Sequence, residues 1–223
     1  MNCIPTQDQM KEALKLRHGE ILQKKFSESR VAVCGLGGLG SNIAIALARA
    51  GVGTLILIDF DRVDISNLNR QQYKANQVGL PKTEALASNL LEIAPYLTLV
   101  THTVRISEHN LAELLFDADV ICEAFDLAKE KAMLVNGCLE RLPNACVVAA
   151  SGMAGLASAN AIRTRKITER FYLCGDGISG QECIPGLIST RVMLCAAHQA
   201  HTVLRILAKN PGAEPTPEMI PQK

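Results

Sequence analysis

Long hydrophobic runs are missing from this sequence. No stretch reaches about 18 uninterrupted apolar residues, the length that a membrane-spanning helix needs, and the segment 1–20 lacks the apolar core of an export signal. Charge of one sign is also scarce, because 23 Lys and Arg face 22 Asp and Glu, and the densest basic cluster is short: Arg163, Arg165, Lys166 and Arg170. We therefore expect a cytoplasmic protein without a membrane partner. A nucleic-acid partner is disfavoured, since such proteins usually carry a basic stripe.

Paired cysteines are missing as well. None of the eight cysteines is separated from another by only two residues, so the C-x-x-C spacing of a structural zinc site is absent, and we expect no zinc. Most of the cysteines lie inside apolar runs, where a free thiol behaves as a small hydrophobic side chain. His198 and His201, three positions apart near the end of the sequence, are interpreted as packing or solvent-facing residues rather than as a metal pair.

The sequence does contain a regular alternation of strand-like and helix-like segments. Apolar runs predict strands at 30–35, 54–59, 97–103, 118–122 and 145–151. Helical spacing predicts helices at 41–50, 82–93, 107–116 and 128–141, with Ser107 as the cap of the third. Continuous apolar strands that alternate with helices favour a parallel sheet covered on both faces. We predict a doubly wound, Rossmann-like α/β fold with a mostly parallel sheet.

The pattern changes after residue 151. Two strands, at 161–166 and 171–174, have no long helix between them and predict an antiparallel C-terminal extension of the sheet. A long apolar helix follows at 187–208. We expect a helical lead-in at 1–29, a single α/β domain at 30–209 and a tail at 210–223 that is rich in proline and disordered.

A glycine-rich turn follows the first predicted strand. Gly35, Gly37 and Gly40 form G-x-G-x-x-G at the mouth of the first helix, and Asp59 ends the next strand. Glycines let the backbone approach a phosphate, and the helix N-terminus presents free N–H groups to it. An acid at the tip of the second strand accepts a hydrogen bond from a ribose hydroxyl. The pattern predicts an adenine nucleotide, but it does not separate NAD, FAD and ATP.

The next segment separates these nucleotides. Residues 59–70 read D-F-D-R-V-D-I-S-N-L-N-R, and G-L-P-K follows, ending at Lys82. An enzyme that expels pyrophosphate develops charge on phosphate oxygens, which fixed cations such as Arg70 and Lys82 stabilise. A nicotinamide enzyme has no need of them. Each cation alone would be an ordinary surface residue, but together, behind the glycine turn, they favour a triphosphate.

Taken in order, these motifs are similar to those of the ubiquitin-activating-enzyme superfamily. The chain carries G-L-G-G-L-G-S, D-F-D-x-V, S-N-L-N-R-Q and G-x-P-K, and the resemblance spans about residues 17–208. Within the superfamily the chain most resembles the short bacterial ThiF-like group rather than the longer, zinc-bearing ThiF and MoeB forms. It shares with that group R-H-G at 17–19, E-A-F-D at 123–126, S-G-M-A-G at 151–155 and C-G-D at 174–176. That group adenylates the sulfur-carrier protein of the thiamine (thiazole) pathway.

The resemblance implies a role for each motif residue. The nucleotide would be lined by Gly35, Gly37, Gly38 and Gly40, and its ribose would be held by Asp59. The phosphates would be surrounded by Asn67, Arg70, Gln71 and Lys82, with Asp61 as a weaker candidate for the same nucleotide site. Asp126 would bind Mg²⁺ near the reacting carboxylate, although the family usually has asparagine at the next position, where this chain has Leu127. A plain helix-capping role is the alternative for Asp126.

Two further residues have roles in related enzymes. An N-terminal arginine reaches across a dimer to the partner's ATP, and Arg17 occupies the matching place; an exposed arginine on an amphipathic helix is the alternative. Some members use a cysteine in the crossover loop to join the carrier covalently, and Cys183 has that setting; an inert surface thiol is the alternative. The resemblance thus implies a homodimer, with a sulfur donor enzyme acting after adenylation.

We expect the function to be ATP-dependent adenylation of the C-terminal glycine carboxylate of a ubiquitin-like sulfur carrier that ends in Gly-Gly, with release of pyrophosphate. The carboxylate is already a nucleophile at neutral pH, so positioning and charge stabilisation suffice. Three alternatives stay open. The first is an NAD-dependent oxidoreductase, which would leave Arg70 and Lys82 without a task. The second is an inactive partner subunit, which would not need to retain these two residues. A related adenylating enzyme with another acceptor, such as a tRNA, is disfavoured by the near-neutral charge.

Overall fold

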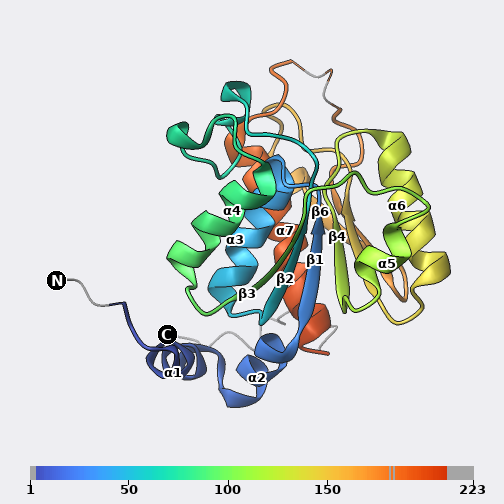
Figure 1. The fold of residues 1–223 in the computed structure, drawn as a ribbon. Helices are drawn as coiled ribbons and strands as arrows, with labels where there is room; N and C mark the ends of the chain where they lie inside the picture. Colours follow the sequence, from blue (N-terminus) through green and yellow to red (C-terminus); the bar gives the residue numbers. More distant parts are fainter. Residues whose placement is uncertain (1–3, 181, 183, 210–223) are drawn as a thin grey trace, which may run out of the picture.

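The computed structural model describes residues 4–180, 182 and 184–209. Its centre is a seven-stranded sheet with the strand order β3-β2-β1-β4-β5-β7-β6 (Figure 1). Neighbouring strands pair in parallel, except for the antiparallel pair of β6 and β7 at one end. The strands are β1 (Arg30–Cys34), β2 (Thr54–Ile58), β3 (Thr98–His102), β4 (Val120–Glu123), β5 (Cys146–Ala150), β6 (Arg163–Thr168) and β7 (Phe171–Gly175). The predicted α/β class and mostly parallel sheet with an antiparallel C-terminal end are confirmed.

Helices cover both faces of this sheet (Figure 1). One face carries α3 (Gly38–Ala50), α4 (Lys82–Ile93) and α7 (Ser189–Leu207), and the other carries α5 (Leu111–Leu115) and α6 (Ala128–Arg141). Each face has its own hydrophobic core, because successive strand residues point to opposite faces: Val31 and Val33 belong to one core, and Ala32 and Cys34 to the other. This double coverage explains why the central strands read as unbroken apolar runs.

Two helices precede the sheet and lie at the amino ends of its strands (Figure 1). α1 (Gln7–His18) begins with a capping box, in which the Thr6 hydroxyl accepts from the Gln9 N–H and the Gln9 side chain accepts from the Thr6 N–H. Gly19, with a φ of 81°, separates α1 from α2 (Glu20–Glu28), a backbone conformation that glycine adopts readily. α2 then leads directly into β1.

The start of α5 differs from the prediction. The sequence placed this helix at 107–116 with Ser107 as its cap, whereas α5 begins at Leu111, after Asn110. The Asn110 side chain closes a turn instead, because it accepts from the Ser107 N–H at 2.8 Å and donates to the Arg105 carbonyl at 3.0 Å. Asparagine side chains compete in this way with helical hydrogen bonds. The prediction of a Ser107 cap was therefore wrong.

The remaining described segments are loops and short turns. The loops after the strands contain three short 3-10 helices, η1 (Ile65–Asn67), η2 (Ala75–Gln77) and η3 (Ala159–Ala161). No helix of the described ranges has the length and apolar character needed to cross a membrane. The predicted disordered tail at 210–223 lies outside the described residues.

The strand order creates an opening at the carboxyl ends of β1 and β4. From β1 the chain passes through α3 to β2 on one side, whereas β4 continues through α6 to β5 on the other side. α3 and α6 cover opposite faces of the sheet (Figure 1). In open α/β sheets, ligands bind in the crevice at such a switch point.

Candidate functional site

A cleft of about 880 Å³ lies at the carboxyl ends of the strands. Its lining comes from the loops that follow β1, β2, β3, β4, β5 and β7, from the first turns of α3, α4 and α6, and from α7. It brings together most of the residues singled out from the sequence: Gly35, Gly37, Gly38, Asp59, Asp61, Asn67, Arg70, Gln71, Lys82 and Asp126. Gly40 and Arg17 are not among the lining residues, and Cys183 lies outside the described residues.

The glycine turn joins β1 to α3 and forms one wall of the cleft. Gly35 has a φ of 89°, and a Cβ there would lie 2.8 Å from the carbonyl oxygen of Ala124. α3 follows Gly37 without a side-chain cap and has no acidic residue in its first turn. Its first N–H groups therefore have no partner within the helix, and together with the helix dipole they provide a binding site for an anion.

Gly40 contributes differently from its neighbours. A Cβ at this position would collide with the carbonyl oxygen of Gly35 and lie 3.1 Å from the Val33 side chain. The missing side chain lets α3 pack closely against the turn, behind the surface that faces the cleft. Gly40 therefore shapes the turn. The sequence had led us to expect Gly40 in the lining of the cleft, but it is not among the lining residues.

Asp59 follows β2 beside the glycine turn, and backbone groups fix its carboxylate. One oxygen accepts from the Leu36 N–H at 2.6 Å and the other from the Asp61 N–H at 2.8 Å. The residue is only 8% exposed, yet it lines the cleft. Each carboxylate oxygen keeps a further lone pair, so Asp59 can still accept a hydrogen bond from a hydroxyl group of a ligand.

Two cations lie on the same side of the cleft. Lys82, the first residue of α4, is buried and forms an ion pair with Asp61, with Nζ and Oδ2 3.0 Å apart. Arg70 donates through Nη1 to the Ser66 carbonyl at 3.1 Å and to the Asn69 side chain at 2.9 Å. Neither side chain uses all its donors in these bonds, so both keep N–H groups for a phosphate.

Asn67 and Gln71 bring amide groups to this side of the cleft. Gln71 is 7% exposed, and its Oε1 has no hydrogen-bond partner among the described residues. A buried polar atom without a partner is costly unless a ligand or water satisfies it. Asn67, in contrast, accepts through Oδ1 from the Asp64 N–H at 3.1 Å, within the short helix η1. The unsatisfied Gln71 amide therefore supports a polar ligand in the cleft.

Asp126 follows β4, on the other side of the glycine turn. It is exposed, and α6 takes Leu127 as its N-cap, so the alternative role as a helix cap is not observed. Within the described part of the chain, no hydrogen bond or ion pair engages its carboxylate. Mg²⁺ binds with nucleotides through one or two carboxylates and the phosphates, and the unengaged carboxylate of Asp126 is of the right chemical kind for this role. No group of three or more His, Cys, Asp or Glu among the described residues is placed to hold a metal by itself.

Sequence reasoning missed a buried ion pair at the end of β4. Glu123 is fully buried, and both of its oxygens lie 3.0 Å from Nζ of Lys131, which also donates to the Ala150 carbonyl at 3.1 Å. Burial raises the pKa of Glu123, although the Lys131 charge and the N–H of Phe125, which donates to Glu123 at 2.7 Å, act in the opposite direction. Glu123 opens the E-A-F-D motif, but only the fold shows that Lys131 is its partner.

Arg105 is another lining cation that the sequence did not signal. Its guanidinium carbon lies 4.2 Å from the centre of the Phe60 ring, and its Nη1 pairs with Glu130 at 2.5 Å. Val104 and Ile106 also line the cleft here. An aromatic ring with apolar neighbours, close to the ribose-binding candidate, suits a flat heterocycle such as adenine.

Arg17 lies away from the cleft of its own chain. It is exposed in the last turn of α1, at the opposite end of the strands (Figure 1). His198 and His201 line a separate groove of about 1340 Å³ between α2, β6 and α7. The Thr164 hydroxyl lies 3.0 Å from Nδ1 of His198, and burial, together with the His201 charge, lowers the pKa of His198. The contact of His198 and the exposure of His201 agree with the packing or solvent-facing roles that the sequence favoured.

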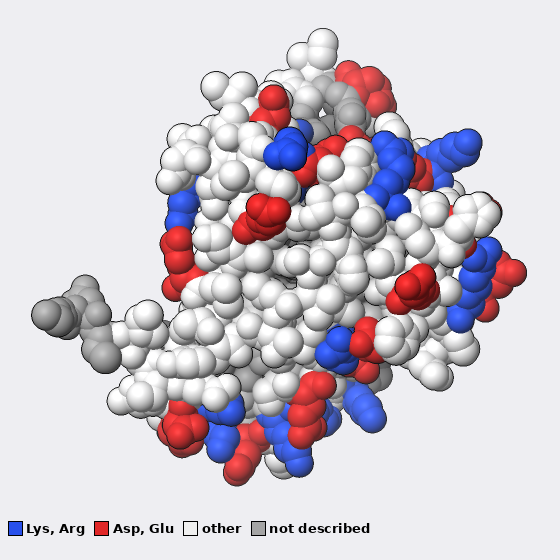
Figure 2. Space-filling view, viewed as in Figure 1, with Lys and Arg blue, Asp and Glu red and all other residues white. Residues whose placement is uncertain are grey.

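Charge is unevenly distributed over the surface. Figure 2 shows side chains of both signs near the upper rim, where the strands end, and near the lower end of the molecule, whereas the middle of this face is largely uncharged. The cleft lining is also mixed, with the cations Arg70, Lys82, Arg105 and Lys131 and the acids Asp59, Asp61, Asp126, Glu130 and Glu182. Such a lining suits an anionic ligand that is bound together with a metal cation.

The sequence and the fold are similar to those of known proteins. A model of the ThiF family matches residues 9–221. Molybdopterin-synthase adenylyltransferase of Escherichia coli (strain K12) is 30% identical over 191 residues, which cover 83% of this chain and 76% of that protein. Adenylyltransferase and sulfurtransferase MOCS3 of Caenorhabditis briggsae is 36% identical over 118 residues, 52% of this chain but only 29% of that protein. Among solved structures, E. coli tRNA N6-threonylcarbamoyladenosine dehydratase, TcdA, in complex with ATP shares the fold with a TM-score of 0.82 at 20% identity, covering 93% of this chain and 98% of that one.

Proposed function

The chain belongs to the ThiF family, and we propose that it is an ATP-dependent adenylyltransferase that activates the C-terminal glycine carboxylate of a ubiquitin-like sulfur-carrier protein. The observation that carries this proposal is the convergence of the glycine turn, Asp59, Arg70 and Lys82 in one cleft, with Asp126 at its β4 side. Both relatives named above are adenylyltransferases, and the E. coli one is named for a protein, molybdopterin synthase. A protein acceptor is therefore the natural choice for this chain.

ATP suits the cleft better than a nicotinamide dinucleotide. The first turn of α3 offers N–H groups to a phosphate, and Asp59 offers an acceptor to the ribose. Arg70 and Lys82 line the same cleft and are the groups that we propose for the further phosphates of a triphosphate. A dinucleotide would leave these two cations without a task.

The proposed reaction needs no covalent nucleophile from the protein. A carboxylate oxygen of the terminal glycine attacks the α-phosphorus of ATP, the bond to the bridging oxygen breaks, and pyrophosphate leaves with the electron pair. Arg70 and Lys82 stabilise the charge that grows on the departing phosphate oxygens. Asp126 would hold Mg²⁺, which neutralises phosphate charge when bound. The cleft itself supplies orientation by holding both substrates side by side.

The proposed carrier ends in Gly-Gly and belongs to the thiamine (thiazole) pathway. The motifs S-G-M-A-G and C-G-D, together with the missing C-x-x-C pairs, support this choice, because they set the chain apart from the longer zinc-bearing forms. The name of the E. coli relative makes a molybdopterin carrier the second candidate. A tRNA acceptor, as in the name of the structural neighbour, is disfavoured by the net charge of +1.

We further propose a homodimer and a sulfur-transfer step after adenylation. Arg17 of one subunit would complete the phosphate site of the other, which agrees with its exposure and its absence from the lining of its own cleft. A sulfur donor enzyme would then displace AMP from the acyl-adenylate, directly or through the thiolate of Cys183. Glu182, which precedes Cys183 in the sequence, lines the cleft.

Exchange of labelled pyrophosphate into ATP tests the proposed function. The purified protein is mixed with ATP, Mg²⁺ and, in turn, ubiquitin-like sulfur carriers of the thiamine and molybdopterin pathways. We expect exchange only with a carrier that has a free terminal glycine, and none with the same carrier lacking that residue. Exchange with the molybdopterin carrier alone would reassign the pathway. Binding of NADH without binding of ATP would overturn the proposal.

A further inference from the structure

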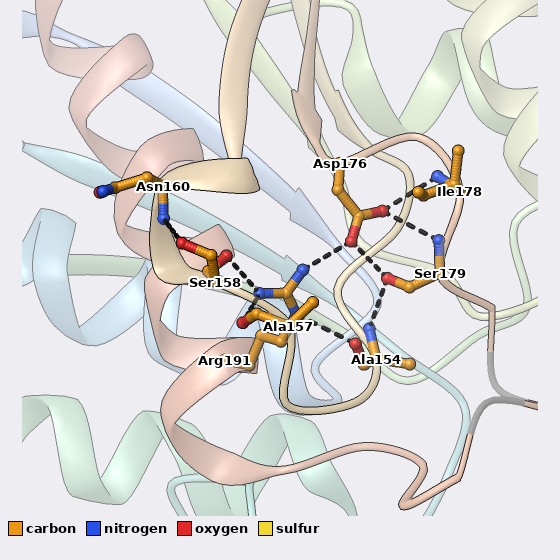
Figure 3. Close-up of polar contacts among 8 residues, drawn as sticks. All are labelled: Ala154, Ala157, Ser158, Asn160, Asp176, Ile178, Ser179 and Arg191. Carbon is orange, nitrogen blue, oxygen red and sulfur yellow. Dashed lines mark hydrogen bonds and ion pairs between the residues drawn. The ribbon is translucent and has the colours of Figure 1, made fainter.

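A buried ion pair holds the side of the cleft that is formed by the loops after β5 and β7. Arg191, in the first turn of α7, and Asp176, after β7, lie with Nη2 and Oδ2 2.6 Å apart (Figure 3). Their side chains are 4% and 5% exposed. We call this pair and its hydrogen-bond partners the clamp.

Arg191 fixes the loop that follows β5. Its Nε donates to the Ala154 carbonyl at 3.0 Å, and its Nη1 donates to the carbonyls of Ala157 at 2.6 Å and Ser158 at 2.9 Å (Figure 3). With the bond to Asp176, every nitrogen of the guanidinium group is used. This planar group therefore ties the loop 154–158 to α7 in one geometry.

Asp176 fixes the loop that follows β7. Its Oδ1 accepts from the N–H groups of Ile178 and Ser179, each at 2.9 Å, and its Oδ2 accepts from the Ser179 hydroxyl at 2.6 Å. The Ser179 oxygen in turn accepts from the Ala154 N–H at 3.1 Å, which joins the two loops. Burial opposes the charged form, but the hydrogen bonds from Ser179, Ile178 and Arg191 outweigh it and hold the pKa of Asp176 well below its usual value.

The position of Arg191 in its helix needs an explanation. A cation in the first turn of a helix is unfavourable, because the N-terminus carries the positive end of the helix dipole. α7 has no acidic residue in its first turn and no side-chain cap. Asp176 supplies the compensating charge from outside the helix. The loops that Arg191 holds therefore explain its position at the start of α7, which the stability of the helix alone does not.

The strand order separates the two sides of the cleft. Across the sheet the strands run β2, β1, β4, β5, β7. Asp59 and the glycine turn follow β2 and β1, and Asp126 follows β4. If the nucleotide binds at the glycine turn with its phosphates on the β4 side, the β5 and β7 side of the cleft is left for the second substrate. On that side the clamped segments 151–154 and 177–180 line the cleft.

The clamped wall is rich in glycine, with Gly152, Gly177 and Gly180 among its lining residues. Gly152, with a φ of 81°, lies so close to Asp176 that a Cβ there would collide with its carboxylate. Gly177, with a φ of 79°, donates its N–H to the Ser151 carbonyl at 2.9 Å. A wall of this kind leaves room for the backbone of an extended peptide, and terminal glycines, which have no side chains, suit it.

We propose that Arg191 and Asp176 are positioning residues that hold this wall in register for the C-terminal peptide of the carrier. They act through the loops 151–158 and 176–180 and leave the nucleotide side of the cleft unaffected. Loosening the clamp weakens the binding of the carrier peptide, because the wall no longer has one geometry. This inference rests on the proposed function.

The test compares the KM for the carrier with the KM for ATP in pyrophosphate exchange. Asp176→Asn and Arg191→Lys weaken the clamp with little change in volume, and we expect each to raise the carrier KM about tenfold or more while the ATP KM stays within about twofold. Ser179→Ala keeps the ion pair and removes only the hydroxyl link between the loops. It is the milder variant in case the other two fail to fold, and we expect a rise of about threefold. Thr190→Ala, an exposed neighbour of Arg191 on α7, is the matched control.

The outcomes distinguish this inference from the proposed function. An unchanged carrier KM in folded variants, or an equal rise of both KM values, overturns the role of the clamp and leaves the proposed function intact. Absence of exchange by the unmodified protein with every carrier overturns both. ATP affinity measured by calorimetry without carrier is the second readout, and we expect the variants to keep it, whereas a merely structural role would lower it together with stability.

Discussion

At the scale of single residues, Arg70 and Lys82 are the groups on which the proposed chemistry depends most. We expect Arg70→Ala and Lys82→Ala each to lower the rate of pyrophosphate exchange by about 100-fold, because each removes a preorganised cation from the departing phosphates. Arg49→Ala, an exposed change in the last turn of α3, is the control and should leave the rate unchanged. A loss of less than about threefold in both cleft variants would mean that the phosphates bind elsewhere.

Lys131 offers a test of stability at the same scale. Lys131→Met leaves Glu123 buried without its partner, so we expect the free energy of unfolding at neutral pH to fall by about 3 kcal/mol, the lower end of the usual range because Lys131 is partly exposed. Glu123, whose pKa burial already raises, then takes up a proton in the folded state more readily than in the unfolded state. The loss should therefore shrink as the pH is lowered.

Urea denaturation at two pH values measures this effect. The double variant Glu123→Gln with Lys131→Met removes both charges and is the control, which we expect to regain part of the lost stability. If the single and double variants are equally destabilised at every pH, the loss comes from packing rather than from an unpaired carboxylate.

The sequence predicted some of the cleft residues and missed others for a physical reason. The glycine turn, Asp59, Arg70 and Lys82 follow one another at short spacings after two strands, so local patterns and the resemblance identified them. Lys131 gave no such signal, because its contact with Glu123 and Ala150 depends on how α6 packs beside β4 and β5. Arg191 bonds to residues more than 30 positions away, which no local pattern encodes.

At the scale of elements, the best predictions concern helices with strong internal spacing. The predicted bounds 82–93 and 128–141 agree with α4 and α6. The predicted helix 107–116 was longer than α5, because the Asn110 side chain closes a turn over its first residues. A helix of only five residues also has little hydrophobic periodicity from which its bounds could be predicted. Element type was therefore predictable, whereas a boundary set by one side chain was not.

The clamp links two loops to α7, and the carboxylate of Asp176 makes this link sensitive to pH. The pKa of Asp176 is lowered in the folded state, so its contribution to stability is complete above the usual value of 3.8 and is lost as the pH falls below it. We expect unmodified protein to lose more stability than Asp176→Asn when the pH is lowered from about 6 to about 3.

Comparing the free energies of unfolding at these two pH values by urea denaturation isolates this residue, because all other carboxylates are common to both proteins. The difference between the unmodified protein and Asp176→Asn should narrow in acid. A constant difference would show that Asp176 does not titrate with folding, and Thr190→Ala should follow the unmodified protein throughout.

At the scale of the whole molecule, α1, which carries Arg17 in its last turn, lies at the amino ends of the strands (Figure 1), whereas the cleft lies at their carboxyl ends. If Arg17 completes the site of a neighbouring subunit, the protein must be a symmetric dimer. Arg17→Ala and Lys82→Ala subunits, each inactive alone, should then regain activity when mixed. In such a heterodimer one cleft carries both defects and the other carries neither, so we expect about half the activity of the unmodified dimer.

Native mass measurement must first confirm that the subunits have exchanged, and mixed Lys82→Ala and Arg70→Ala subunits are the control. Both of these changes lie in the same cleft, so every site of that heterodimer keeps one defect and no activity should return. If the Arg17→Ala mixture behaves like this control, Arg17 does not act across a dimer.

β6 forms one edge of the sheet, and all six of its residues are exposed. Such an edge presents unpaired backbone groups, which are a template for strands of other molecules and for fibril growth. Arg163, Arg165 and Lys166 lie in β6, and its register with β7 shifts between Lys166 and Thr168. Like charges and an irregular edge both oppose the stacking of identical sheets. The three basic residues of β6 therefore oppose aggregation of the protein through its own exposed strand.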